Sequence, residues 1–224
     1  MSTAQKQLTV DVIRHGEPEG GDILRGRINP LLTDTGWQQM RRATGLDSAL
    51  VHPQSPAWSH VISSPLKRCA DFAHYVANRL NLAEADIDPA WQEIDYGDWD
   101  GMPIEQWRAV AAPQFAAFRH DLAALAPPNG ETWLAFRDRV LAAWQALLDY
   151  PDDSHLLLVT HGGVLRVILP TVLGMPLNAS FPLHIPFASF SRLQLRTSKE
   201  GLRATLLFHN AAAYALPAAE NPDQ

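Results

Sequence analysis

The stretch LTVDVIRHG, residues 8–16, decides how the chain folds. Its first six residues are mostly apolar and predict a strand buried on both faces, and Gly16 marks the point at which that strand must turn. Arg14 and His15 therefore stand at the carboxyl end of a strand, where open α/β sheets bind their ligands. Arg14 offers a planar, permanently charged fork that suits a phosphoryl group, and the imidazole of His15 can act as a nucleophile beside it.

Composition narrows the class of protein. The 224 residues carry a net charge of −6, and 46% of them are hydrophobic. An acidic chain is a poor generic binder of nucleic acid or of anionic membranes, so any basic site has to be local. The only cysteine is Cys69, which excludes a disulfide framework, and the sequence shows no apolar signal-peptide core and no run of membrane-spanning length. We therefore expect a cytoplasmic protein without nucleic-acid or membrane partners.

Strand-like and helical runs alternate along the chain. The apolar patterns predict strands at residues 8–13, 60–64, 155–160, 187–197 and 204–210, and helices at residues 33–50, 65–80, 131–150 and 162–174. A section rich in Trp, Pro and Ala, about residues 91–130, is expected to form short helices packed as a cap. No linker, charge block or repeat divides residues 1–224, which indicates a single domain. The alternation predicts an α/β sandwich with a mainly parallel sheet.

Local signals set the expected ends of several helices. Thr33 and Asp34 are candidate caps for the first helix. Pro65 fits the first position of the second helix, because a proline there loses no hydrogen bond. The last predicted helix is expected to be kinked or interrupted at Pro170.

Three predicted strand ends carry polar residues of related kinds. The first is Arg14-His15, the second leads into a helix whose first turn holds Arg68, and the third ends in His161-Gly162. In a parallel sheet these ends share one edge, so two arginines and two histidines can converge there. Backbone amides at the helix start that includes Gly162 would add donors for an anion.

Each of these residues also has a plain structural interpretation. Arg14 could belong to a buried ion pair, Arg68 could be a solvated helix residue, and His161 could serve only the turn. That interpretation requires three coincidences at three corresponding strand ends. The pattern therefore favours one phosphoryl-binding site.

A phosphoryl acceptor also needs a proton donor for the departing alkoxide. The segment EIDYGDWDG, residues 93–101, supplies four carboxylates beside aromatic residues and turn-forming glycines. A carboxyl group partly buried there could have its pKa raised enough to act as an acid, while nearby arginines would lower that pKa. From the residues alone, Glu93, Asp95, Asp98 and Asp100 remain nearly equal candidates.

Taken together, these motifs resemble the histidine phosphatase superfamily, in its phosphoglycerate-mutase-like branch. The matching stretches run from about residue 10 to residue 192 and comprise VIRHGE (12–17), LLTDTGWQQM (31–40), SSPLKRCADFA (63–73), QEIDYGDWDG (92–101), PPNGETWLAFRDRV (127–140) and VTHGGVLRVIL (159–169). The resemblance implies a three-layer α/β/α sandwich with a mainly parallel central sheet and a helical cap insertion.

The same resemblance implies roles for individual residues. His15 would be phosphorylated transiently, and Arg14, Arg68 and His161 would bind the phosphoryl oxygens. Glu93, the first acid of its segment, would be the proton donor and acceptor. Because arginines supply the positive charge, we expect no metal and no cofactor, and the partner would be a small phosphorylated metabolite.

Two positions favour hydrolysis over phosphoryl transfer between substrates. Phosphoglycerate mutases of this superfamily usually carry RHG-x-S-x-x-N, whereas here Pro18 and Gly21 stand at the Ser and Asn positions. The chain also lacks the basic, proline-rich insertion that those mutases place after the acid loop. The resemblance therefore favours a phosphatase.

Among phosphatases, residues 16–40 are most similar to α-ribazole phosphatases of cobalamin synthesis. α-Ribazole 5′-phosphate is thus the expected substrate, and Arg25 is an expected additional contact to it. The alternatives are another small phosphorylated metabolite, a cofactor-dependent phosphoglycerate mutase, or a phosphate-ligand binding protein without activity. A homodimer through the closing strands or a surface helix is compatible with the sequence.

Overall fold

The central element of the molecule is one sheet. The computed structural model describes residues 6–47, 57–199 and 201–211, and within them six strands pair in the order β3-β2-β4-β1-β5-β6. The strands are β1 (Gln7–Arg14), β2 (His60–Ser63), β3 (Asp86–Ile87), β4 (His155–Thr160), β5 (Phe190–Ser198) and β6 (Gly201–His209). The first four in this order are parallel, and β5 and β6 add an antiparallel edge. The predicted mainly parallel sheet is confirmed.

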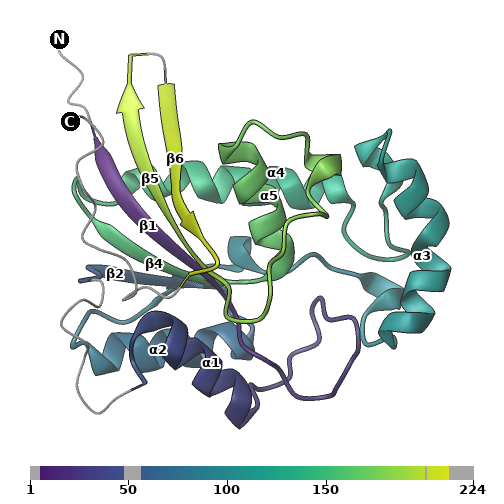
Figure 1. Cartoon of the computed structure of the whole chain (residues 1–224), viewed down its shortest axis with the longest axis horizontal. Helices are drawn as coiled ribbons and strands as arrows, with labels where there is room; N and C mark the ends of the chain where they lie inside the picture. Colours follow the sequence, from purple (N-terminus) through teal and green to yellow (C-terminus); the bar gives the residue numbers. More distant parts are fainter. Residues whose placement is uncertain (1–5, 48–56, 200, 212–224) are drawn as a thin grey trace.

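Helices cover both faces of this sheet. They are α1 (Asp34–Thr44), α2 (Lys67–Arg79), α3 (Ile104–Phe118), α4 (Trp133–Ala146) and α5 (Gly162–Val172). Figure 1 shows α1 and α2 on one face and α4 and α5 on the other, with α3 displaced to the end of the molecule. The three-layer α/β/α architecture that the resemblance implies is therefore confirmed.

Alternate residues of each central strand supply two separate cores. On β4, Leu156 and Leu158 pack with α4 and α5, whereas Leu157 and Val159 pack with α1 and α2. All four side chains are completely buried, and burying each contributes roughly 1.5–3 kcal/mol relative to exposure. This two-sided burial explains why the strand has no polar alternation, and it fixes the carboxyl end of β4 at the sheet edge.

Helix ends agree with the sequence in part. Thr33 caps α1 as expected, since its side chain accepts a hydrogen bond from the amide of Gly36. The helix ends at Thr44 and not at residue 50, because Gly45 takes a left-handed conformation (φ 73°) that closes it. Residues 48–50 of the predicted helix lie outside the described residues.

The two predictions from prolines need correction. Pro65 is not the first residue of α2, because Leu66 is extended (ψ 131°) and the helix begins at Lys67. At Pro170, α5 is not interrupted but continues to Val172, so the predicted interruption is wrong and the alternative, a kink, stays a prediction. The proline lies in the last turn of the helix, so few helical hydrogen bonds follow it.

The segment between the second and fourth helices holds the irregular part of the fold. It contains the single-turn helices η1 (Pro89–Trp91), η2 (Gly97–Trp99) and η3 (Leu122–Ala124) around the longer α3. Two more single turns, η4 (Leu147–Asp149) and η5 (Leu177–Ala179), follow α4 and α5. In the part of the chain that the structure describes, no helix is long and apolar enough to cross a membrane.

Candidate active site

The three polar strand ends meet at one edge of the sheet. β4 lies between β1 and β2, and Arg14 pairs in register with Thr160. The rings of His15 and His161 are in edge contact, with their centroids 5.3 Å apart. The convergence predicted from the sequence therefore occurs.

A cavity of about 790 Å³ opens at this edge. Of the residues predicted to form the site, Arg14, His15, Arg25, Glu93 and Gly162 line it. The remaining wall combines apolar and aromatic side chains with charged ones, and it comes mainly from the loop after β1, from α3 and from the segment after α5. The edge of the sheet thus faces a cavity large enough for a drug-sized ligand.

His15 is held in a single orientation. Its side chain is buried, and its Nδ1 lies 2.8 Å from the carbonyl oxygen of Gly16. A carbonyl can only accept, so Nδ1 carries the proton and Nε2 keeps its lone pair. Nε2 has no hydrogen-bond partner among the described residues. Burial, reinforced by the charges of Arg68 and Arg14, holds the pKa of His15 well below its ordinary value, so the ring is neutral.

Arg14 presents its guanidinium to the same cavity. One end is fixed, because Nη1 donates to the carbonyl of Ile185 at 2.7 Å and the guanidinium lies 4.3 Å from the ring centroid of Phe187. Its buried Nε has no partner in the described part of the chain. Burial lowers the pKa of Arg14 to about 10, against the opposing charge of Glu93, and the group remains charged at neutral pH.

Arg68 and His161 lie behind the cavity wall and have no exposed surface. Nη1 and Nη2 of Arg68 donate to the carbonyls of Ile28 and Gly26, at 2.7 and 2.8 Å. Nε2 of His161 lies 2.8 Å from the hydroxyl oxygen of Ser64. Burial, with the charge of Arg68 added, holds the pKa of His161 well below its ordinary value. The structure therefore brings both residues to His15 but not to the cavity surface.

The four acids of residues 93–101, equal in the sequence, differ in the structure. Glu93 is buried and is the one of the four that lines the cavity. Asp95 accepts from the amide of Gly97 within its own turn, and Asp98 is exposed. Asp100 points at a different loop. Only Glu93 is placed to exchange a proton with a ligand in the cavity.

The Glu93 carboxylate is held by two backbone amides. Oε2 accepts from Gly163 at the start of α5, and Oε1 accepts from Ile94, both at 3.0 Å. The carboxylate lies so close to α5 that a Cβ on Gly163 would be 2.1 Å from Oε1. Glycine at position 163 is therefore required for this placement.

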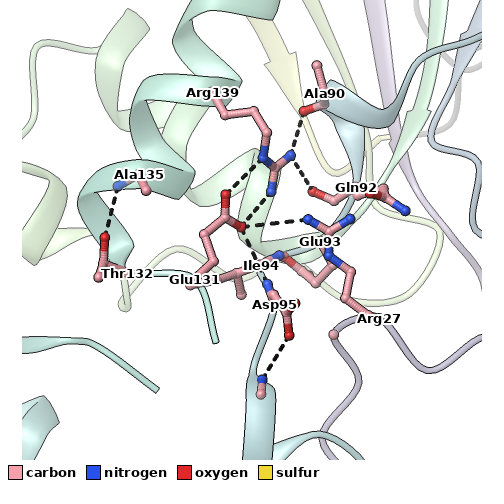
Figure 2. A network of polar contacts seen from close by, with 12 residues as sticks. Arg27, Ala90, Gln92, Glu93, Ile94, Asp95, Glu131, Thr132, Ala135 and Arg139 are labelled. Atoms are coloured by element: carbon pink, nitrogen blue, oxygen red, sulfur yellow. Dashed lines mark hydrogen bonds and ion pairs between the residues drawn. The ribbon is translucent and has the colours of Figure 1, made fainter. Parts of the chain in front are cut away.

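A partly buried ion pair between Arg139 and Glu131 fixes the backbone on both sides of Glu93. Figure 2 shows Arg139 of α4 donating to the carbonyls of Ala90 and Gln92 and forming a two-bond pair with Glu131. Glu131 in turn accepts from the amide of Asp95 at 3.4 Å. The segment that carries Glu93 is thus anchored to Arg139 of α4, directly on one side and through Glu131 on the other. In the sequence, Glu131 and Arg139 stand only within one of the stretches that carry the family resemblance, and their function in the site was not predicted.

Three further arginines line the cavity: Arg25, Arg108 of α3 and Arg166 of α5. Arg25 donates to the carbonyls of Glu19, Gly21 and Ile23, so its guanidinium braces its own loop. Arg166 was not singled out in the sequence. It lies one helical turn after Gly162 on α5, which is the spacing that could have revealed it.

Comparison with known proteins identifies the family. Residues 10–206 match the family model described as "Histidine phosphatase superfamily (branch 1)". A relative from Proteus mirabilis, named "Probable phosphoglycerate mutase GpmB", is 31% identical over 197 residues, which cover 85% of this chain and 86% of the relative.

Solved structures show the same fold. The α-ribazole phosphatase from Shigella flexneri superposes with a TM-score of 0.74 at 25% identity, covering 95% of this chain and 100% of that one. A mycobacterial glucosyl-3-phosphoglycerate phosphatase superposes with a TM-score of 0.73 at 24% identity, covering 92% and 99%. Since the family match spans most of the sequence, the chain belongs to the histidine phosphatase superfamily, branch 1, and is an enzyme of the phosphatase class.

Proposed function

We propose that this protein hydrolyses phosphomonoesters through a covalent intermediate on Nε2 of His15. The observation that carries the proposal is the state of the His15 ring. Nδ1 is committed to the carbonyl of Gly16, and the unpaired Nε2 belongs to a neutral imidazole that lines a cavity shared with Arg14 and Glu93. A nucleophile, a cation and a proton donor are the three groups that such a reaction needs.

In the first step, the lone pair of Nε2 attacks phosphorus in line with the ester oxygen. The N–P bond forms, the P–O bond breaks with its electron pair on the leaving oxygen, and protonated Glu93 gives that oxygen its proton. In the second step, a water attacks phosphorus while the Glu93 carboxylate takes a proton from it. The N–P bond breaks, its pair returns to Nε2, and inorganic phosphate leaves.

Charge complementarity to the phosphoryl oxygens supplies the remaining stabilisation. Arg14 and the amide of Gly162 would contact these oxygens from the cavity wall. Arg68 and His161 lie next to His15, and we propose that both stabilise the phosphoryl oxygens from their present positions. Because Nη1 and Nη2 of Arg25 donate to carbonyls of its own loop, we propose that Arg25 contributes to substrate binding by holding that loop in place.

The substrate that we propose is α-ribazole 5′-phosphate. Similarity to the α-ribazole phosphatase fold supports it, and so does the aromatic wall of the cavity, which includes Trp107, Phe115, Trp133, Phe181 and Phe187. A planar, apolar leaving group such as a benzimidazole nucleoside can bury its faces against such a wall. Residues 91–130, within the single domain, would then act as the cap that selects the leaving group.

A substrate panel tests this proposal. It compares kcat/KM for α-ribazole 5′-phosphate, 3-phosphoglycerate, glucosyl-3-phosphoglycerate and simple sugar phosphates. We expect α-ribazole 5′-phosphate to lead by at least about tenfold, the discrimination that 1.4 kcal/mol provides. Mutase turnover of 3-phosphoglycerate would overturn the proposal, and uniformly weak hydrolysis of the whole panel would reject the proposed substrate.

A further inference from the structure

Asp100 makes an unusual set of contacts for a residue outside the cavity. Its carboxylate accepts hydrogen bonds from the amides of Gly26, Arg27 and Ile28, at 2.7, 2.7 and 2.8 Å. Bonds from amides to a charged carboxylate are short and among the strongest that a backbone makes. One side chain therefore fixes three consecutive residues of the loop that follows β1.

The opposite side of the same loop holds Arg68. The carbonyls of Gly26 and Ile28 are the acceptors for the two terminal nitrogens of that guanidinium. The peptides of residues 26–28 thus turn their N–H groups towards Asp100 and present two of their carbonyls to Arg68. The peptides of the loop link the Asp100 carboxylate to the Arg68 guanidinium, and the hydrogen bonds at their two ends polarise the same peptides in one direction. Such bonds strengthen each other.

Close packing also restricts the movement of residues 26–28. It packs against the segment that carries Glu93, because a Cβ on Gly26 would lie 2.5 Å from the carbonyl oxygen of Ile94. A displacement of residues 26–28 would therefore disturb both Arg68 and the neighbourhood of Glu93. Asp100 is the side chain that opposes such a displacement.

Arg68 has no direct carboxylate partner within residues 6–47, 57–199 and 201–211. A carboxylate in direct contact would compete with a phosphoryl group for the fork of the arginine. Two carbonyls orient the fork without neutralising it, and they leave its buried Nε unpaired. Asp100, which is linked to Arg68 only through the peptides of residues 26–28, can thus stabilise the position of Arg68. The charge of Arg68 stays available to a phosphoryl group.

We propose that Asp100 is a positioning residue that holds Arg68 for the phosphoryl group, acting through the backbone of residues 26–28. The inference rests on the proposed role of Arg68 in binding phosphate.

Replacing Asp100 tests the first part of this inference. Asp100→Asn removes the charge and one of the two acceptor oxygens, and we expect kcat/KM to fall by about 10- to 100-fold, as for other groups that orient a site residue. The dissociation constant of inorganic phosphate, measured by calorimetry, should rise in parallel. The matched control is Asp98→Asn, an exposed acid of the same segment that bonds Asn129, which should stay within about twofold of wild type.

A double-mutant cycle tests the route through Arg68. Arg68→Ala should itself be severely impaired. In that background Asp100→Asn should cost less than about threefold, because its effect depends on the missing guanidinium. An equal loss in both backgrounds, or no loss in the single variant, would overturn the role of Asp100. Wild-type activity of Arg68→Ala would instead reject the proposed role of Arg68, so the two failures are distinguishable.

If Asp100→Asn does not fold, the cycle is run with Asp100→Glu, which keeps the charge but displaces it by one methylene. The loss in kcat/KM should again nearly vanish beside Arg68→Ala. A loss that is additive with Arg68→Ala would overturn the proposal.

Discussion

The two sides of the cavity are built in different ways. The phosphoryl wall is defined as Arg14, His15, Glu93, Gly162 and Gly163. It stands on the end of β1 and on the start of α5, and Glu93, from the irregular segment after η1, is held against it by the amide of Gly163. The cap wall, defined as residues 19–25, α3 and residues 177–187, is joined by loop contacts such as the bond from the amide of Ile104 to the carbonyl of Asp22. The difference is consistent with the proposal that the sheet edge, with Glu93 held against it, carries the chemistry and that the cap wall selects the substrate.

Removal of the proton donor from the phosphoryl wall should have the largest effect and tests whether this wall carries the chemistry. Glu93→Gln should lower kcat by about 10²- to 10⁴-fold for alkyl phosphates, whose leaving group needs a proton. The loss should be far smaller for p-nitrophenyl phosphate, whose leaving group departs as an anion. Asp95→Asn, in which the acid serves only its own turn, is the control. Equal losses on both substrates would contradict the role of Glu93.

Gly163→Ala adds a methyl group to the same wall and should have a smaller effect on kcat. Gly163→Ala places a carbon where the Glu93 carboxylate now lies, and we expect kcat to fall by about 10- to 100-fold with the leaving-group dependence of Glu93→Gln. Gly162→Ala borders Arg14 instead, so it should weaken phosphate binding without that dependence. Kinetics on alkyl and p-nitrophenyl esters distinguish the two, and a Gly163→Ala enzyme of normal activity would show that the close approach is unimportant.

A truncation in the cap wall should change selection and leave the chemistry intact. Trp107→Ala removes a ring that lines the cavity, and we expect KM for a naphthyl phosphate to rise about tenfold while kcat/KM for glycerol phosphate changes little. Val110→Ala, on the exposed side of the same helix, serves as the matched control. If both esters suffered equally, the cap wall would not be the selecting side.

The smallest effect concerns stability against pH. The pKa values of His15 and His161 are held well below 6.5 in the folded protein, so below pH 6.5 the unfolded chain binds more protons than the folded one. Stability therefore falls as the pH falls below about 6.5, by on the order of 1 kcal/mol per pH unit for each histidine. Urea unfolding between pH 7.5 and 5.5 should show a shallower slope for His15→Asn than for wild type. His120→Asn, an exposed change, should keep the wild-type slope, and identical slopes for all three proteins would contradict the assignment.

The part of the phosphoryl wall that stands on β1 and α5 could be predicted because regular structure fixes it. Alternation and apolar runs give the strands, parallel pairing places their ends together, and Arg14, His15 and His161 follow from that. The choice among the four acids could not be made in this way. It depends on the missing Cβ of Gly163 and on the anchoring of the Glu93 segment by Arg139, and both are contacts between residues distant in sequence.

The cap wall was predicted least well for a physical reason. Its loops lack a repeating pattern, so the bonds by which Arg25 braces its own loop do not follow from propensity. Arg68 illustrates the same limit within the predicted site. Its place beside His15 was foreseen, but its complete burial and its carbonyl partners depend on how residues 26–28 fold back over it.

The central claim is that His15 carries the phosphoryl group during turnover, and a rapid-quench trap tests it most directly. The enzyme is mixed with a ³²P-labelled phosphomonoester, quenched in alkali within milliseconds, digested and examined by mass spectrometry. We expect an acid-labile, alkali-stable phosphate on the peptide that contains His15, and none in His15→Ala. Full hydrolytic turnover by His15→Ala, or turnover by the wild-type enzyme with no phosphate ever trapped on that peptide, would contradict the account.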